Sequence, residues 1–374
     1  MKALISLLLA VSLPLTPARA ATLKVGPAQT LPTPGAAARI AQDGDTVEID
    51  AGDYTGDVAV WRANRLTLRG VNGSARLNAA GKSAEQKAIW VIKGNDTTVE
   101  HVEFSGCRVP DHNGAGIRQE GANLTVRHCR FHNNENGILS GAHRMSDILV
   151  EHSEFAGNGF GDGYSHNLYI GNVRRFTLRY CWSHGARTGH LVKSRATENF
   201  ILCNRLDDGP EGSSSYVVDL PDGGRSFILG NLLRHGPRAE NGTGVSYAAE
   251  STKNEFPRLF VAHNTFINER LAGGRFVRVG GRDAKAVVVN NLVIGTKVVL
   301  DGAGEARDNL VSDAPGFVDA AAGDFRLKPG SPALEASSDP GKIGDIRLLP
   351  EFMYSHPLDR KPRPAAARPN AGAF

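Results

Sequence analysis

The 374-residue sequence has few of the residues that build large helical cores, with 3 Trp, 3 Met and 7% aromatic residues against 43 Gly. Beyond position 20, no segment approaches 18 consecutive apolar residues, so no membrane-spanning helix is indicated. The G-x-S-x-G motif of nucleophile-elbow hydrolases does not occur. Lys and Arg are scattered without a basic helix or an aromatic platform, which argues against nucleic-acid binding. These absences favour a turn-rich, all-β protein.

The first 20 residues have the pattern of a secretory signal peptide. Lys2 precedes an apolar run over residues 3–13, and residues 18–20 read Ala-Arg-Ala, an A-x-A cleavage signal. We therefore expect cleavage after Ala20 and a secreted or periplasmic monomer without an integral membrane span. In such a compartment an even number of cysteines permits disulfides. The four cysteines are Cys107, Cys129, Cys181 and Cys203.

A repeat of about 27 residues runs through the chain, because several segments align on one small polar residue that follows an apolar-alternating strand. These residues are Cys129, Ser153, Cys181, Asn204, Asn231, Asn264 and Asn291, separated by 24, 28, 23, 27, 33 and 27 residues. A fixed strand and turn with irregular spacing predicts a solenoid of coils with variable loops. Asn side chains stacked at a tight inward turn can hydrogen-bond from coil to coil. We interpret Cys129 and Cys181 as small fillers of this ladder.

The two ends of the chain differ from the repeat. We expect the first strand at residues 46–52, preceded by a helix-like run over residues 34–42 that caps the open end of the solenoid. The predicted organisation is a signal peptide (1–20), one β-helix domain (21–335) and a Pro/Ala-rich C-terminal tail (336–374). That tail either packs along the solenoid, covers its end, or is disordered.

The repeat resembles that of the right-handed parallel β-helix proteins, in particular the secreted polysaccharide lyases, over residues 23–291. The resemblance implies an all-β, single-domain right-handed parallel β-helix. It also implies a carbohydrate ligand, and a formal charge of +4 fits an acidic polysaccharide.

Three hexamers can be laid over one another: HNLYIG (166–171), HLVKSR (190–195) and YVVDLP (216–221). Their starts lie 24 and 26 residues apart, which is one coil of the repeat. Because side chains alternate along a strand, the apolar residues fix which positions face inward. The fourth residue of each hexamer then faces outward.

The alignment predicts an outward column of mixed charge. Tyr169, Lys193 and Asp219 follow one another from coil to coil, with Arg118 and Leu139 below them in two earlier coils. Coils stack about 4.8 Å apart, so these groups can converge on one sugar. A solvated polar face is the alternative, although long Gly-rich loops flank the column and loops often carry sites.

The same phase places His166 and His190 inward or at the strand edge. Two interpretations remain open. The pair is either a stacked, hydrogen-bonded corner, or at least one ring is catalytic.

Eliminative cleavage of a uronic acid polymer needs a cation for the C6 carboxylate, a base for the C5 proton and an acid for the leaving oxygen at C4. Lys193 is the candidate base, provided that a neighbouring charge such as Arg195 lowers its pKa. Tyr169 or His190 is the candidate acid. Arginines that could hold the carboxylate are Arg195, Arg187 and Arg238. Further candidate substrate contacts are His166, Asp219 and Arg118.

The segment LVKSRATENFILCN (191–204) is similar to the V-K-S strand and the following Asn coil of the chondroitinase B-like and alginate lyase β-helix family. The resemblance implies Lys193 as the base. That family has a catalytic Arg in an R-H-G motif on the next coil's strand, where this sequence has Asp219. Residues 234–236 read Arg-His-Gly, but they follow the ladder residue Asn231, so we expect them in a loop.

Other functions remain open because of this departure. A glycoside hydrolase would use Asp219 with Asp207 or Asp208. An epimerase shares the proton-abstraction step, and residues 110–112 carry part of its D-P-H-D signature. A glycan-binding solenoid without turnover is the non-enzymatic alternative.

A calcium cofactor is also open. The resemblance to the alginate lyase β-helix family implies a calcium site, but the sequence has no clear trio of Asn and Glu in register for it. Loop carboxylates can bind Ca²⁺ or be solvated turn residues. The loop carboxylates are Asp162, Asp207, Asp208 and Glu211.

Overall fold

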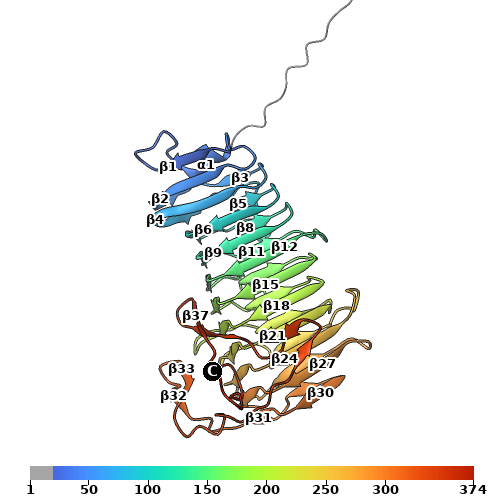
Figure 1. Cartoon of the computed structure of the whole chain (residues 1–374). Helices are drawn as coiled ribbons and strands as arrows, with labels where there is room; N and C mark the ends of the chain where they lie inside the picture. The colour runs from blue at the N-terminus through green and yellow to red at the C-terminus, as the bar shows by residue number, and fades with distance from the viewer. Residues whose placement is uncertain (1–19) are drawn as a thin grey trace, which may run out of the picture.

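The computed structural model describes residues 20–374, so the predicted signal peptide up to residue 19 lies outside the described residues. Parallel strands wind into a solenoid that runs from the blue end to the orange end in Figure 1. The described residues contain one α-helix, α1 (Pro34–Ala38). The predicted all-β parallel β-helix is confirmed. Within residues 20–374, no helix has the length and apolar character needed to cross a membrane.

One face of the solenoid is a parallel sheet of ten strands. They are β3 (Ala59–Trp61), β5 (Ala88–Ile92), β8 (Ala115–Gln119), β11 (Asn136–Ser140), β14 (Leu168–Ile170), β17 (Val192–Ser194), β20 (Val218–Leu220), β23 (Thr243–Tyr247), β26 (Arg275–Val279) and β29 (Leu300–Asp301). Each strand comes from a successive coil, so neighbours in this sheet are one repeat apart in the sequence.

The other faces belong to a 21-stranded sheet made of two stacks. The first stack is β1 (Thr22–Val25), β2 (Thr46–Thr55), β4 (Thr67–Asn78), β6 (Thr97–Glu100), β9 (Leu124–Arg127), β12 (Asp147–Glu151), β15 (Arg175–Arg179), β18 (Glu198–Leu202), β21 (Arg225–Leu229), β24 (Arg258–Ala262), β27 (Lys285–Val289) and β30 (Gly304–Arg307). The second is β7 (Val102–Ser105), β10 (Arg130–His132), β13 (Glu154–Ala156), β16 (Trp182–His184), β19 (Arg205–Asp207), β22 (Leu232–His235), β25 (Thr265–Asn268), β28 (Leu292–Ile294) and β31 (Leu310–Val311).

Alternation along each strand decides which side chains fill the solenoid. In β15 the side chains of Phe176 and Leu178 are fully buried, whereas Arg175 is exposed. Aromatic rings at equivalent positions stack between coils, and the centroids of Phe104, Phe131 and Phe155 are 4.9 and 4.8 Å apart. This is the strand spacing of a parallel sheet. Each such buried side chain contributes roughly 2 kcal/mol of transfer free energy.

The predicted Asn ladder joins the two stacks of the large sheet. The backbone N–H of Asn204 donates to Asn231 Oδ1 (2.9 Å), that of Asn231 to Asn264 Oδ1 (2.9 Å), and that of Asn264 to Asn291 Oδ1 (2.8 Å). Asn309, which was not recognised in the sequence, extends the ladder by accepting from Asn291 N–H (3.0 Å). Each side chain therefore fixes the register of two adjacent coils.

All four cysteines are buried free thiols. Cys129 and Cys181 occupy ladder positions, and the N–H of Cys129 donates to Ser153 Oγ (3.1 Å), which confirms their role as fillers. Cys107 starts a second ladder at another corner, where its N–H donates to Asn134 Oδ1 (3.0 Å). Burial raises the pKa of the Cys107 and Cys129 thiols to about 12, so both stay protonated.

The N-terminal end is built differently from the prediction. Helix α1 is shorter than the expected run, and Thr33 caps it by accepting the N–H of Ala36 on its hydroxyl (3.2 Å). The expectation that the first strand lies at 46–52 was wrong, because β1 precedes it and pairs with β2, with Thr22 opposite Thr46.

After β31 the chain turns back beside the solenoid, where β37 lies next to much earlier coils (Figure 1). It forms three antiparallel hairpins: β32 (Phe317–Asp319) with β33 (Asp324–Leu327), β34 (Lys342–Ile343) with β35 (Ile346–Arg347), and β36 (Phe352–Ser355) with β37 (Asp359–Pro362). His152 Nδ1 lies 2.8 Å from Leu358 O, and Ala373 N–H donates to Thr265 Oγ1 (3.0 Å). The tail thus packs along the solenoid.

Replacing a central ladder residue should destabilise the fold strongly. Asn231→Ala leaves the buried N–H of Asn204 and two backbone carbonyls without their partner. We expect the free energy of unfolding to fall by at least about 2 kcal/mol in urea titrations. Asn309→Ala, at the partly exposed end of the ladder, should cost less. Equal losses of unfolding free energy for the two variants would show that the cost does not depend on how deeply the ladder residue is buried.

Candidate active site

The predicted outward column forms on the ten-stranded sheet. Tyr169 lies opposite Lys193, and Lys193 lies opposite Asp219. Leu139 and Arg118 occupy the same position in the two coils below. The register that was inferred from the three hexamers is therefore confirmed.

Tyr169, Lys193 and Arg195 come together at the surface of this sheet. Lys193 Nζ lies 5.3 Å from the centre of the Tyr169 ring. Arg195 Nε donates to the Tyr169 hydroxyl (3.1 Å). The Lys193 side chain is 13% exposed and the Arg195 side chain 20%, so both cations can be reached from solvent. An anionic ligand could therefore contact both.

Asp219 supplies a buried carboxylate to this group. Its Oδ2 lies 3.5 Å from Lys193 Nζ and 3.6 Å from His190 Nε2, and the side chain is only 4% exposed. Burial raises the pKa of Asp219 to about 6, although the charge of Lys193 acts in the opposite direction. This carboxyl group therefore titrates close to neutral pH.

His166 and His190 form a stacked corner, with ring centroids 4.5 Å apart and an interplanar angle of 7°. The N–H of His190 donates to His166 Nδ1 (2.9 Å), and the N–H of Tyr216 donates to His190 Nδ1 (3.1 Å). Asn136 begins this series by accepting the N–H of His166 (2.9 Å). Gly189 lets the coils approach, because a Cβ there would lie 1.9 Å from Ser165 O and 3.0 Å from His166 Nδ1. The imidazoles thus form the stacked, hydrogen-bonded corner of the first interpretation, while a catalytic role for either ring stays a prediction.

Both histidines are neutral near pH 7. Burial, aided by the charge of Lys193, lowers the pKa of His190 to about 3. Burial also lowers the pKa of His166 well below its ordinary value, with a further contribution from the neighbouring His190. Because each Nδ1 accepts a backbone N–H, the ring proton is on Nε2. His190 can donate a hydrogen bond from Nε2, but it carries no imidazolium proton to transfer.

Three further residues complete the group and were not recognised in the sequence. Arg195 Nη1 donates to Asp222 Oδ1 (2.9 Å), and its Nη2 donates to Glu250 Oε2 (2.7 Å). Ser246 lies opposite Asp219 in the next strand of the sheet. Extending the column by one coil would have found Ser246. No periodic signal marks Glu250, which lies on a loop after β23.

The other arginines that were expected to contact substrate lie differently. Arg187 Nη2 donates to Asn133 Oδ1 (2.9 Å), and Arg238 Nη1 lies 2.6 Å from Glu211 Oε2. Arg118 is part of the column, two coils below Tyr169. A substrate contact by any of these arginines stays a prediction.

Asp207 and Asp208 contact other groups than Asp219 does, and a hydrolytic pair of either residue with Asp219 stays a prediction. Asp207 lies in β19 and is bound by Arg205 (2.6 Å) and Arg234 (3.3 Å). Asp208 accepts the N–H of Ser214 (3.2 Å). Their carboxylates satisfy local cations and backbone groups of the large sheet and its loops.

The Arg-His-Gly segment is not in a loop as expected, since Arg234 and His235 lie within β22. Arg234 donates to both oxygens of Glu269, at 2.9 and 2.8 Å. This strand belongs to the large sheet and not to the ten-stranded sheet. The segment therefore has a structural role away from the column.

The loop carboxylates considered for calcium are dispersed. Asp162 accepts the N–H of Tyr164 (3.0 Å), and Glu211 pairs with Arg238. Across residues 20–374, no three His, Cys, Asp or Glu side chains gather as a metal site would require.

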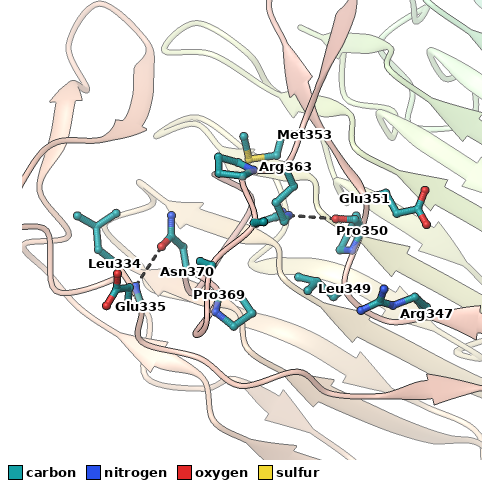
Figure 2. Close-up of a pocket in the computed structure, with 13 residues that line it drawn as sticks. Leu334, Glu335, Arg347, Leu349, Pro350, Glu351, Met353, Arg363, Pro369 and Asn370 are labelled. Carbon is teal, nitrogen blue, oxygen red and sulfur yellow. Dashed lines mark hydrogen bonds between the residues drawn. The ribbon is translucent and has the colours of Figure 1, made fainter.

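A cavity of about 510 Å³ lies within the C-terminal segment (Figure 2). Its hydrogen bonds connect parts of this segment to one another: Arg363 Nε donates to Pro350 O (3.1 Å), and Glu335 N–H donates to Asn370 Oδ1 (3.0 Å). The cavity brings no acid and base side chains into contact comparable to those of the column. We therefore place the candidate site on the ten-stranded sheet.

Comparisons with known proteins agree with this architecture. Residues 67–206 match the family model of the right handed beta helix region. The pectate lyase Pel9A superposes with a TM-score of 0.63 at 14% sequence identity, covering 95% of this chain and 96% of that chain. An alginate lyase from Paenibacillus sp. str. FPU-7 has a TM-score of 0.50 at 12% identity, covering 76% of this chain and 99% of that chain. No curated protein sequence matches the chain. At these identities the likeness shows the fold, a right-handed β-helix like those of polysaccharide lyases.

The raised pKa of Asp219 predicts a pH-dependent stability. The folded value of about 6 exceeds the ordinary 3.8, so the folded state binds the proton more tightly than the unfolded state. Its stabilisation is full below about pH 4 and is lost as the pH rises through 6. The free energy of unfolding of the wild type, minus that of Asp219→Asn, should therefore fall by roughly 2 kcal/mol between pH 4.5 and pH 7.

Urea titrations of both proteins at the two pH values measure this difference. Asp283→Asn, at an exposed position, controls for a general charge effect. The same difference at both pH values would show that Asp219 titrates as an ordinary exposed carboxyl.

Proposed function

We propose that this protein is a polysaccharide lyase that cleaves an anionic, uronate-containing glycan by β-elimination, outside the cytoplasm. The observation that carries the proposal is the convergence of Tyr169, Lys193 and Arg195 on one face of the ten-stranded sheet. A proton acceptor, a proton donor and a cation for the substrate carboxylate are then within reach of one sugar. The fold, which resembles those of a pectate lyase and an alginate lyase, supports the same reading.

In the proposed reaction Nζ of Lys193 acts as the base and takes the C5 proton. The electron pair of the C5–H bond forms the C4–C5 double bond, and the C4–O4 bond breaks. Tyr169 gives its hydroxyl proton to the leaving O4, while Arg195 stabilises the negative charge that develops on the substrate carboxylate. Return of the proton from Lys193 to Tyr169 restores the starting state, so the cycle needs no external acid or base.

Tyr169 suits the role of the acid better than His190. Its hydroxyl accepts a hydrogen bond from Arg195 Nε (3.1 Å), which stabilises the oxygen after the proton has left. His190 is buried, and its Nδ1 is occupied by the N–H of Tyr216. A ring with a pKa of about 3 holds no transferable imidazolium proton at neutral pH.

Hydrolysis is the second candidate, because one specific observation favours it. Asp219 has a raised pKa of about 6, as a general acid requires. The second carboxylate near Lys193 is that of Glu250, whose Oε1 lies 3.8 Å from Lys193 Nζ. A hydrolase would therefore use Asp219 with Glu250 in place of Asp207 or Asp208. Such a pair would release saturated fragments, whereas a lyase releases fragments with a C4–C5 double bond.

Loss of the base should abolish the unsaturated product. We expect Lys193→Ala to lower kcat/KM by at least ~100-fold, the usual contribution of a positioned base. The measurement is the ultraviolet absorbance of the C4–C5 double bond with alginate, pectate, glycosaminoglycans and bacterial exopolysaccharides. Lys285→Ala, at an exposed position of β27, is the matched control and should keep full activity.

The same screen separates the alternatives. If only saturated fragments are released, the protein is a hydrolase and the lyase proposal is wrong. If a glycan binds but no fragment is released, and Lys193→Ala binds that glycan as tightly as the wild type, the protein is a glycan-binding solenoid without catalytic activity.

Removing the acid should matter only for poor leaving groups. Tyr169→Phe keeps the ring beside Lys193 but has no proton to give, so kcat on the natural glycan should fall about 100-fold with little change in KM. A synthetic uronate with fluoride at C4 needs no protonation of its leaving group. Equal losses of kcat on both substrates would assign the proton transfer to another residue.

A further inference from the structure

The loop after β23 folds back over the candidate site. Glu250 N–H donates to Pro221 O (3.0 Å), and Asn254 Nδ2 donates to Arg195 O (3.2 Å). Asn172, which follows β14, donates from Nδ2 to Asn254 Oδ1 (3.1 Å). Residues 248–254 therefore reach across the ends of three successive strands of the ten-stranded sheet. This anchoring carries Glu250 to cations that belong to earlier coils.

The Glu250 carboxylate lies between the two cations of the column. Its Oε2 accepts from Arg195 Nη2 (2.7 Å), and its Oε1 lies 3.8 Å from Lys193 Nζ. The Glu250 side chain is 51% exposed, whereas those of Lys193 and Arg195 are 13% and 20% exposed. One carboxylate thus contacts both cations from the solvent side.

Lys193 and Arg195 each contact a second carboxylate, which is too deeply buried for a ligand to displace. Lys193 faces Asp219, which is 4% exposed, and Arg195 binds Asp222, which is 2% exposed. Lys253 Nζ also binds Asp222 (2.8 Å), which ties that carboxylate to the loop. Glu250 is the exposed anion of this network, and without it the three cations outnumber the two buried carboxylates.

We propose that Glu250 occupies the anion subsite of the column and that the carboxylate of an acidic sugar displaces it, which makes Glu250 the specificity-determining residue. The substrate class rests on the proposed function, but the exchange rests on the contacts of Glu250. An acidic sugar replaces the close contact with Arg195, and Lys193 is then left to act as the base of the proposed reaction. A neutral sugar leaves Arg195 without the exposed anion, so the loop excludes it.

Removing the competing charge should strengthen binding of acidic sugars. Glu250→Gln keeps the size and exposure of the side chain but gives up the ion pairs, so tetragalacturonate or tetramannuronate should bind about 5-fold more tightly than to the wild type. Isothermal titration calorimetry at constant ionic strength measures both affinities, with cellotetraose as the neutral comparison. The melting temperature of the variant checks that it remains folded.

Glu255→Gln is the matched control, because it removes the same charge from an exposed position close to the same loop. It should leave the affinities at their wild-type values. The proposal is overturned if Glu250→Gln binds neither acidic oligosaccharide more tightly than the wild type and Glu255→Gln do. Equal affinities and absent binding both count as this outcome.

The absorbance assay for unsaturated product is read separately. If Glu250→Gln binds more tightly but no unsaturated product is formed, the lyase proposal is wrong and the anion subsite is supported. If unsaturated product is formed but Glu250→Gln binds with wild-type affinity, the lyase proposal is supported and the exchange is wrong.

Discussion

The register between coils is the constraint on which the rest of this structure depends. Backbone hydrogen bonds of parallel strands hold adjacent coils at the strand spacing, but they alone would allow a coil to slip along its neighbour. Side-chain acceptors at the corners prevent this, because the N–H of Asn204 can reach only the amide of Asn231, one coil on. Once every coil is fixed in this way, residues about one repeat apart must share a column. The convergence of Tyr169 and Lys193 is a direct consequence.

The two histidines of the site obey the same constraint. Each Nδ1 takes the place that an Asn oxygen takes elsewhere, and the series passes from Asn136 through His166 and His190 to Tyr216. Their burial keeps them neutral. For this reason the proposed reaction assigns its proton transfers to the outward residues at the neighbouring positions.

Periodic features could be predicted from the sequence, and loop features could not. The ladder and the column follow from spacing and alternation, since a one-residue error would turn apolar residues outward. Asn309 was missed because its coil is short, with 18 residues separating it from Asn291. Glu250 reaches the column through a loop that crosses coils, and no spacing encodes such a contact, whereas Asp222 lies one repeat of 27 residues after Arg195.

Comparison with an exposed ion pair on the large sheet distinguishes the column from a solvated polar face. On the large sheet, charges alternate from coil to coil through Glu48, Arg69, Glu100, Arg127 and Glu151. Arg69 and Glu48 there are 44% and 24% exposed, and such pairs cost little because water still solvates them. Lys193 and Asp219 are 13% and 4% exposed and 3.5 Å apart, so their desolvation is not offset by a close hydrogen bond. In the proposed exchange an exposed anion, first Glu250 and then a substrate carboxylate, completes the balance of these charges.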